Sequence, residues 1–166
     1  MRHTEADTIL GPLTLVADGD ALAAVYFPGH WTLPRRESFG ERVTRDSLMD
    51  DAARQLREYL AGERRGFELT TAPRGNGFQL GVWELLAGIP YGSTTTYGLL
   101  AERLGGRSLA QTVGQAVGHN PLSIIIPCHR VVGSDGGLTG YAGGLERKRF
   151  LLELEEPPEV KAARLF

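Results

Sequence analysis

The apolar residues of this chain change their spacing about halfway along it, and this change limits the folds open to it. Residues 8–27, TILGPLTLVADGDALAAVYF, form two β-type runs on either side of the turn sequence ADGD, which predicts a hairpin. Segment 28–42 is rich in proline, glycine and charge and is expected to be a loop. Residues 46–64 and most of the chain after residue 77 place apolar residues at helical spacing. Strands first and helices later are typical of an α+β protein.

Helices are expected at five places, most of them ended by glycine or proline. The predicted ranges are 46–61, 78–89, 97–104, 108–118 and 145–156. Ser108 stands where the N-cap of the fourth helix is expected, and Gly118 stands near its end. A boundary near residues 72–77 predicts a small N-terminal α/β domain, 1–74, with an antiparallel sheet and a helix. A mostly helical C-terminal domain, 75–166, is expected to follow it.

Composition excludes several classes of protein. Hydrophobic residues make up 42% and charged residues 23% of the 166, and no apolar run is long enough to span a membrane. The start of the chain has no basic segment followed by an apolar stretch, so nothing there suggests export. The single cysteine, Cys128, cannot form an internal disulfide or a cysteine zinc site. A free thiol persists most easily in a reducing cytosol, so we expect a cytoplasmic protein.

The charged residues are unevenly distributed. The net charge is -2, yet residues 97–150 carry 6 Lys and Arg against 3 Asp and Glu, an excess of 3 positive charges. The chain as a whole is therefore not a basic nucleic-acid binder, and this segment is the part that favours an anion.

The third and fourth predicted helices are joined by a short glycine-bearing turn, residues 105–107, and have the form of a helix-turn-helix. Such pairs are also common in protein cores that bind nothing. Four residues of the second helix are small: Ala110, Gly114, Ala116 and Gly118. A helix with so few long side chains is poorly suited to read bases in a major groove. Small residues let its backbone approach either a packed core or a narrow minor groove, and the residues alone leave both open.

The sequence IIIPCHRVVG, residues 124–133, contains the cysteine within an apolar run. We expect residues 123–126 to form a strand that ends at Pro127, because proline restricts the residue before it to extended geometry. Cys128 would then lie at a change of direction. A nucleophilic thiol needs a base, and His129 is the nearest one if a turn or a water brings the two together. The alternative, a structural cysteine in a buried strand, is the commoner case for a lone Cys beside a His.

Two features follow this segment. The loop 133–144, GSDGGLTGYAGG, is too rich in glycine to build a core and permits close approach to a ligand. Arg147, Lys148 and Arg149 begin the last helix, where a solvated helix face is the simplest interpretation. Glu155, or Glu153, on the same helix could accept a hydrogen bond from His129.

Together these residues resemble the O6-alkylguanine-DNA alkyltransferases, also called methylated-DNA–protein-cysteine S-methyltransferases. The matching sequences are FQLGVWELLAGIPYG, TTTYGLLAERLG, VGHNPLSIIIPCHRVVG and LTGYAGGLERKRFLLELE, and they cover about residues 75–155. The hairpin that begins with GPLTL is also similar to the family's N-terminal domain. The PCHRV sequence between an Asn-Pro hinge and a Gly-Tyr-x-Gly-Gly loop is a highly specific combination.

The resemblance implies a single-turnover repair reaction on double-stranded DNA that contains O6-alkylguanine. The helix-turn-helix would enter the minor groove, and the damaged base would be flipped into a pocket. By position, Cys128 would accept the alkyl group, His129 would act as base through a water and Glu155 would orient His129. The remaining implied catalytic residues are Asn120, which stabilises the turn, and Tyr97, which promotes flipping and can donate a proton to the departing guanine. Residues implied to bind the base or DNA are Thr95, Ser108, Gln111, Arg130, Tyr141, Ala142 and Lys148, with structural support as the other role of Arg130 and Lys148. The resemblance implies no metal or organic cofactor and a monomer.

Three positions depart from the family. Gln111 stands where an arginine usually fills the gap left by the flipped base, so weaker DNA binding or slower repair is expected. Ala142 stands where serine is common in some members. The cysteines of members with an N-terminal zinc site are absent.

Two other functions stay open at this point. One is a module that binds alkylated bases with weak or no transfer, which Gln111 favours and Cys128 opposes. The other is a Cys/His hydrolase or a small-molecule alkyl acceptor on the same scaffold.

Overall fold

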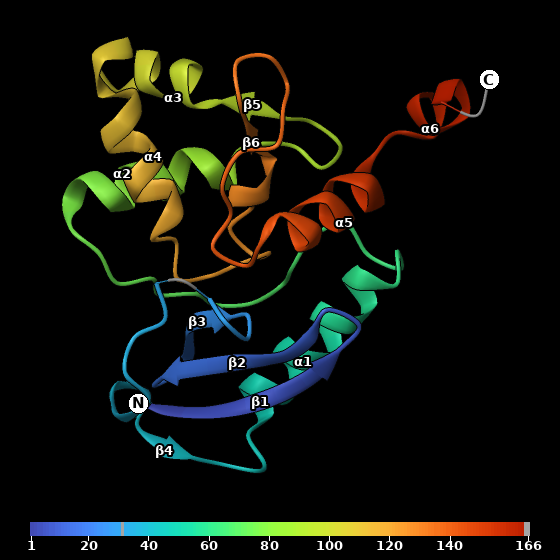
Figure 1. Cartoon of the computed structure of the whole chain (residues 1–166). Helices are drawn as coiled ribbons and strands as arrows, with labels where there is room; N and C mark the ends of the chain where they lie inside the picture. Colours follow the sequence, from blue (N-terminus) through green and yellow to red (C-terminus); the bar gives the residue numbers. More distant parts are fainter. Residues whose placement is uncertain (31, 165–166) are drawn as a thin grey trace.

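The computed structural model describes residues 1–30 and 32–164, so Trp31 in the predicted loop and the last two residues of the predicted second domain lie outside it. Figure 1 shows a sheet with helix α1 at one end of the molecule and a group of helices at the other. The chain is therefore α+β, as predicted. No helix within the described residues is long and apolar enough to cross a membrane.

The N-terminal sheet has four strands in the order β3-β2-β1-β4. These are β1 (Arg2–Thr8), β2 (Gly11–Asp18), β3 (Ala21–Tyr26) and β4 (Glu41–Arg42). The predicted hairpin is β2 and β3, which pair antiparallel around Gly19, whose φ of 59° suits the tight turn. Strand β1 was not predicted, because RHTEADT buries only His3 and Ala6 and shows no apolar alternation. The predicted loop also contains β4 and a 3-10 turn at Arg36–Phe39 (η1).

Helix α1 (Ser47–Leu60) lies against one face of this sheet (Figure 1). It begins where Asp46 accepts a hydrogen bond from the Met49 amide, at 3.1 Å, as an N-cap. Gly62 follows its end with a φ of 79°, the left-handed conformation that glycine adopts readily. The buried side of the helix reaches its last turn at Tyr59 and Leu60.

The helical part begins with α2 (Gly77–Ala87), which starts in a capping box formed by Asn76 and Gln79. The helix-turn-helix follows as β5 (Thr95–Thr96), α3 (Tyr97–Leu104), the 3-10 turn η2 (Arg107–Leu109) and α4 (Ala110–Gly118). Thr96 caps α3 by accepting a hydrogen bond from the Leu99 amide at 3.2 Å. The prediction of Ser108 as the N-cap of the next helix is wrong. Ser108 lies inside η2, and α4 begins after Leu109 without a side-chain cap.

The predicted strand at residues 123–126 is wrong as well. The segment forms consecutive buried turns, and Ile124 has a φ of 72°, which no strand residue adopts. A short 3-10 helix, η3 (Cys128–Arg130), follows Pro127, and β6 (Val131–Val132) then pairs parallel with β5. The last elements of the described residues are α5 (Leu145–Glu155) and α6 (Pro158–Arg164).

Strand β3 joins the N-terminal sheet to the segment that precedes the cysteine. The Val25 amide donates to the Pro121 carbonyl at 2.8 Å, and Ser123 N donates to the Val25 carbonyl at 3.3 Å. On the same strand Leu22 exchanges two backbone bonds, both 2.9 Å, with Thr70 and Ala72. Buried apolar residues from the sheet, α1, α2, α4 and α5 form one continuous cluster. The domain boundary at residues 74 and 75 stays a prediction.

Candidate active site

Cys128 begins the 3-10 helix η3 and is 6% exposed. Its amide donates to the Ile126 carbonyl at 2.8 Å, which bends the chain sharply around Pro127. Burial raises the pKa of the thiol, whereas Asn120, the charge of Lys148 and Tyr141 lower it. Burial is the larger effect, so the thiol is protonated at rest and needs a base before it can act as a nucleophile.

Asn120 holds the turn that carries the cysteine. Its Nδ2 donates to the Ile126 carbonyl at 2.8 Å, and its Oδ1 accepts from the Leu122 amide at 3.0 Å. The side chain is 2% exposed. Its bonds satisfy buried backbone groups that a strand would have paired with a neighbouring strand. Asn120 therefore stabilises the turn in which Ile124 adopts a positive φ, a conformation that isoleucine does not favour.

His129 and Glu155 form a buried pair directly behind the cysteine. The His129 Nε2 and Glu155 Oε2 atoms lie 2.8 Å apart, with the side chains 0% and 2% exposed. Arg130 donates two hydrogen bonds to Glu155, from Nε to Oε1 at 2.8 Å and from Nη2 to Oε2 at 3.1 Å. Tyr59 of α1 donates a further hydrogen bond to Oε2. Glu155 thus accepts from Arg130 and Tyr59 and faces Nε2 of His129.

This arrangement determines the tautomer of the imidazole. Burial raises the pKa of Glu155, but a protonated carboxyl could not accept from all of these donors, and the guanidinium stabilises the ionised form. His129 must then carry its proton on Nε2. Its Nδ1 is buried without a partner among the described residues, which leaves a free lone pair. Burial lowers the pKa of His129 well below 6.5, and Arg130 and Lys148 lower it further, so the ring is neutral.

The glycine-rich loop lies over the cysteine and is held by Lys148. Lys148 is 0% exposed, and its Nζ donates to the carbonyls of Val131 at 2.7 Å and Thr139 at 3.2 Å. The hydroxyl of Tyr141 is buried without a hydrogen-bond partner of good geometry within residues 1–30 and 32–164. Burial raises the pKa of Tyr141 well above 10, and the Cys128 thiol raises it further, so the two groups interact.

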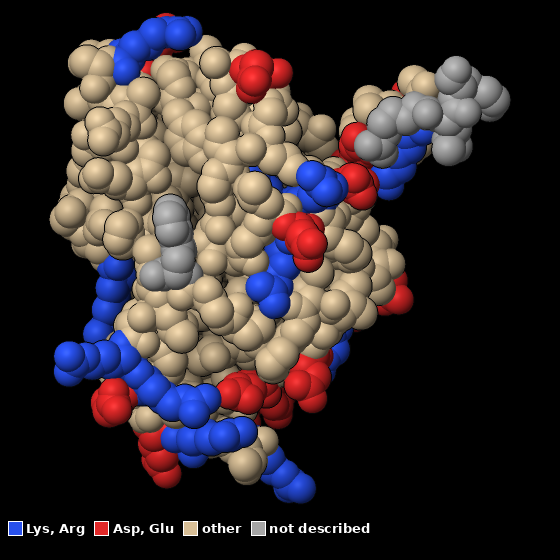
Figure 2. Space-filling model, in the orientation of Figure 1, with Lys and Arg blue, Asp and Glu red and all other residues tan. Residues whose placement is uncertain are grey.

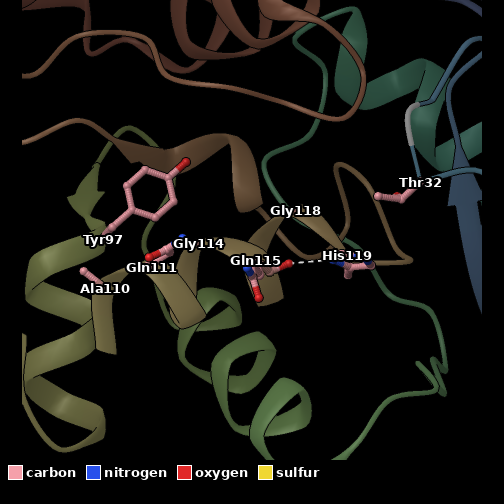
Figure 3. Close-up of a pocket in the computed structure, with 8 residues that line it drawn as sticks. All are labelled: Thr32, Tyr97, Ala110, Gln111, Gly114, Gln115, Gly118 and His119. Atoms are coloured by element: carbon pink, nitrogen blue, oxygen red, sulfur yellow. Dashed lines mark hydrogen bonds between the residues drawn. The ribbon is translucent and has the colours of Figure 1, made fainter. Parts of the chain in front are cut away.

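A cavity of about 590 Å³ opens beside α4 (Figure 3). It is lined by Thr32, Tyr97, Ala110, Gln111, Gly114, Gln115, Gly118 and His119. Tyr97, at the start of α3, faces the small residues of α4, and Thr32 comes from the N-terminal part. The other small residue, Ala116, is 3% exposed, and its carbonyl accepts from Trp83 Nε1 at 2.8 Å. The small residues of α4 therefore serve a packed core on one side and an open cavity on the other.

Two family models match the chain. The 6-O-methylguanine DNA methyltransferase, ribonuclease-like domain matches residues 1–73, and the DNA binding domain of the same enzyme matches residues 77–157. The chain belongs to the 6-O-methylguanine DNA methyltransferase family.

Individual members of the family are similar over nearly the whole chain. The methylated-DNA–protein-cysteine methyltransferase of Methanosarcina barkeri is 54% identical over 157 residues, which cover 94% of this chain and 98% of that protein. The enzyme of the same name from Methanosarcina acetivorans is 44% identical over 156 residues, 93% of this chain and 98% of that protein. The crystal structure of Mycobacterium tuberculosis OGT in complex with DNA superimposes with a TM-score of 0.86 at 42% identity and covers 93% of each chain.

The resemblance implies two roles for Arg130 and Lys148 in this methyltransferase, DNA binding or structural support. Both are buried and hydrogen-bonded to groups of the protein, which favours structural support, and their contact with DNA stays a prediction. The solvated-face interpretation of the last helix fails at Lys148. Arg147 donates to the carbonyls of Leu10 and Gly143, both at 2.9 Å.

Of the six cations of residues 97–150, Arg130, Arg147 and Lys148 are buried or half-buried, whereas Arg103, Arg107 and Arg149 are exposed. In Figure 2 the surface over α3 and α4 is mostly uncharged, and charged side chains gather over the N-terminal sheet and α5. The outer face of the helix-turn-helix includes exposed Ser108 and Gln111 and half-buried Thr95, while Ala142 is half-buried next to Tyr141. Their contacts with DNA or base stay predictions. Within the described residues no cluster of His, Cys, Asp and Glu could hold a metal ion.

One residue of this site was not predicted from the sequence. Tyr59 lies within residues 46–64, whose apolar helical spacing contains no signal for the bond from its hydroxyl to Glu155.

Proposed function

We propose that this protein repairs O6-alkylguanine in double-stranded DNA by transferring the alkyl group to Cys128. The observation that carries the proposal is the buried thiol next to a neutral imidazole whose tautomer leaves Nδ1 free. A cysteine that served only packing would need neither a charged network behind it nor a cavity-bearing helix beside it. The family membership and the DNA-bound relative support the same reaction.

The reaction we propose is an in-line displacement at carbon. The thiol proton passes through a water to Nδ1 of His129, and Sγ of Cys128 attacks the alkyl carbon. A thioether forms as the carbon–O6 bond breaks. The electron pair of the broken bond remains on O6 of the guanine. Alignment of the two reacting centres and removal of water from the thiolate supply the acceleration.

Tyr97 is the group we propose as proton donor to the departing guanine. Thr139 Oγ1 donates to the Tyr97 hydroxyl at 3.0 Å, so the proton of Tyr97 is free to point elsewhere. Burial raises the pKa of this tyrosine, which keeps the phenol protonated at neutral pH. The same side chain borders the cavity of α4, where it would crowd a DNA backbone.

We propose that α4 enters the minor groove and that the flipped base occupies the space between this helix and the loop of Tyr141. Gly114 and Gly118 allow the close approach that a minor groove requires. Gln111 would fill the gap in the duplex and hydrogen-bond the unpaired cytosine, without the charge of an arginine. Flipping costs a few kcal/mol, and less for a mispaired base.

Among the described residues we assign no group to hydrolysis of the thioether, so we propose a single turnover. We also propose that the protein acts as a monomer. A buried free thiol further supports work in a reducing compartment such as the cytoplasm.

The test is intact-mass measurement after incubation with a duplex that contains O6-methylguanine. One methyl group in place of the thiol proton, absent in Cys128→Ser, is the expected result. Tight binding of the damaged duplex without a mass change would instead indicate a damage-binding module, and turnover of a substrate other than DNA would indicate a hydrolase.

A further inference from the structure

We propose that Tyr59, on helix α1 of the N-terminal part, is a positioning residue for alkyl transfer: its hydroxyl holds Glu155 in the form that keeps Nδ1 of His129 free. The proposal rests on the function proposed above. It gives the N-terminal part a role in the chemistry, although α1 lies far from Cys128 in the sequence.

The hydroxyl lies at the centre of the buried network. Tyr59 is 1% exposed, donates to Oε2 of Glu155 and accepts from Nη2 of Arg130 at 3.1 Å. The same Oε2 atom lies 2.8 Å from Nε2 of His129. Tyr59 therefore shares an acceptor atom with the imidazole and touches both charged partners of the ion pair.

Packing alone does not require a hydroxyl at this position. The Tyr59 ring stacks on Phe67 with centroids 5.0 Å apart and meets the edge of Tyr91 at 5.9 Å. A phenylalanine would keep both contacts. The hydroxyl is favourable here because Glu155 accepts its hydrogen bond, since a buried O–H without an acceptor would destabilise the fold.

Loss of the hydroxyl would act on His129 through Glu155. With one donor fewer, the ionised carboxylate is less stable, and Glu155 takes up a proton at a higher pH. A protonated carboxyl donates to Nε2 of His129, and the ring proton then has to reside on Nδ1. In that tautomer His129 cannot accept the thiol proton of Cys128.

Other charged and titratable groups face this network and remain in the variant. From η3 these are His129 and the Arg130 guanidinium, and from α5 Lys148, whose charge acts on His129 and Cys128. Arg65 and Arg130 both lie over the ring of Tyr91, at 5.1 and 5.6 Å from its centroid. The Arg130 guanidinium bonds to both oxygens of Glu155 and favours its ionised form, so we expect a shift of about one pH unit rather than loss of the carboxylate.

The experiment compares Tyr59→Phe with Tyr91→Phe. Tyr91 is the matched control because its hydroxyl donates to the Leu154 carbonyl, at 3.3 Å, and has no bond to Glu155. Two rates are measured from mildly acidic to mildly alkaline pH. One is single-turnover methyl transfer from an O6-methylguanine duplex, and the other is alkylation of Cys128 by iodoacetamide without DNA.

In Tyr59→Phe the acid limb of both profiles should move upward by about one unit, with about tenfold slower reaction on that limb. Tyr91→Phe should follow the wild type. Unchanged profiles in Tyr59→Phe, or equal shifts in both variants, would overturn the proposal. If the wild type transfers no methyl group, the proposed function fails, and the iodoacetamide profiles still decide the role of Tyr59.

A measurement on the wild type covers the case in which Tyr59→Phe does not fold. Nitrogen chemical shifts of the His129 imidazole should show the neutral form with its proton on Nε2 throughout the active range. A proton on Nδ1 in that range would contradict the role assigned to Tyr59.

Discussion

The Nε2 atom of His129 lies 2.8 Å from Oε2 of Glu155, and both side chains are closed off from solvent. The pair connects the turn that holds Cys128 to the last turn of α5. Because Glu155 is also paired with Arg130, its carboxylate both orients the imidazole and neutralises a buried cation. Activity and stability therefore depend on the same carboxylate.

Glu155→Gln should lower the rate of methyl transfer at least about 100-fold, because an amide can present N–H to the imidazole and favour the wrong tautomer. It should also destabilise the protein by about 3–5 kcal/mol, since Arg130 is left buried without its counter-ion. Single-turnover assays at equal folded fraction and urea unfolding measure the two effects. Exposed Glu153 on the same helix is the matched control, and Glu153→Gln should change neither.

Gln111→Arg should speed repair by up to about tenfold, because an arginine adds charge and stacking in the gap left by the flipped base. The measurement is the single-turnover rate and the affinity for damaged duplex at fixed salt. Gln115→Arg adds the same charge one turn further along α4, on the same cavity. If Gln115→Arg helps equally, or Gln111→Arg does not help, the assignment of Gln111 to the duplex gap is wrong.

Gly114→Ala separates close approach to DNA from folding. An added Cβ would lie 3.7 and 3.8 Å from the Tyr97 ring, an ordinary contact, and alanine favours a helix by up to about 1 kcal/mol over glycine. We expect an unchanged or higher melting temperature, with weaker binding of damaged DNA. Thr112→Ala, on the exposed side of α4, should keep wild-type binding. Wild-type affinity in Gly114→Ala would argue against entry of this face into a groove.

His30 should make the protein less stable in acid. It is 4% exposed, both ring nitrogens lack partners among the described residues, and burial lowers its pKa to about 4. The unfolded chain takes up this proton near pH 6.5, so stability falls between about pH 6.5 and 4, at up to about 1.4 kcal/mol per pH unit. His129, whose pKa is also lowered, should add to the loss.

His30→Phe should remove the share of this loss that belongs to His30, because phenylalanine keeps the ring contacts with Tyr26 and Phe27. Urea unfolding at pH 7.5 and 5 measures the difference, with pH values chosen on either side of about 6.5, the ordinary His pKa. An equal loss in variant and wild type would show that His30 does not titrate in this way.

Periodicity was sufficient to predict the β2–β3 hairpin and most of the helices, because their apolar residues face one side. It failed at β1, where few residues are apolar, and at residues 123–126. There the isoleucines lie on turns, which combine backbone bonds with side-chain bonds from Asn120. The three consecutive isoleucines, 124–126, look alike in a strand and in a buried turn.

The reactive centre was predicted more completely than its support. Cys128, His129 and Glu155 followed from motif resemblance, and the structure places the last two in contact. Burial of Lys148 within the charged run LERKR could not be inferred, since neighbouring Arg149 is exposed. The bond from Tyr59 joins residues 96 positions apart, a distance over which local pattern carries no information.

The central claim is that Cys128 accepts one alkyl group and then stops. Peptide mapping by mass spectrometry after reaction with excess O6-methylguanine duplex tests it most directly. We predict one methyl group per protein molecule, on the peptide that contains Cys128, and restored guanine in an equal amount. Repeated turnover with unmodified protein, or a methyl group on another residue, would contradict the account.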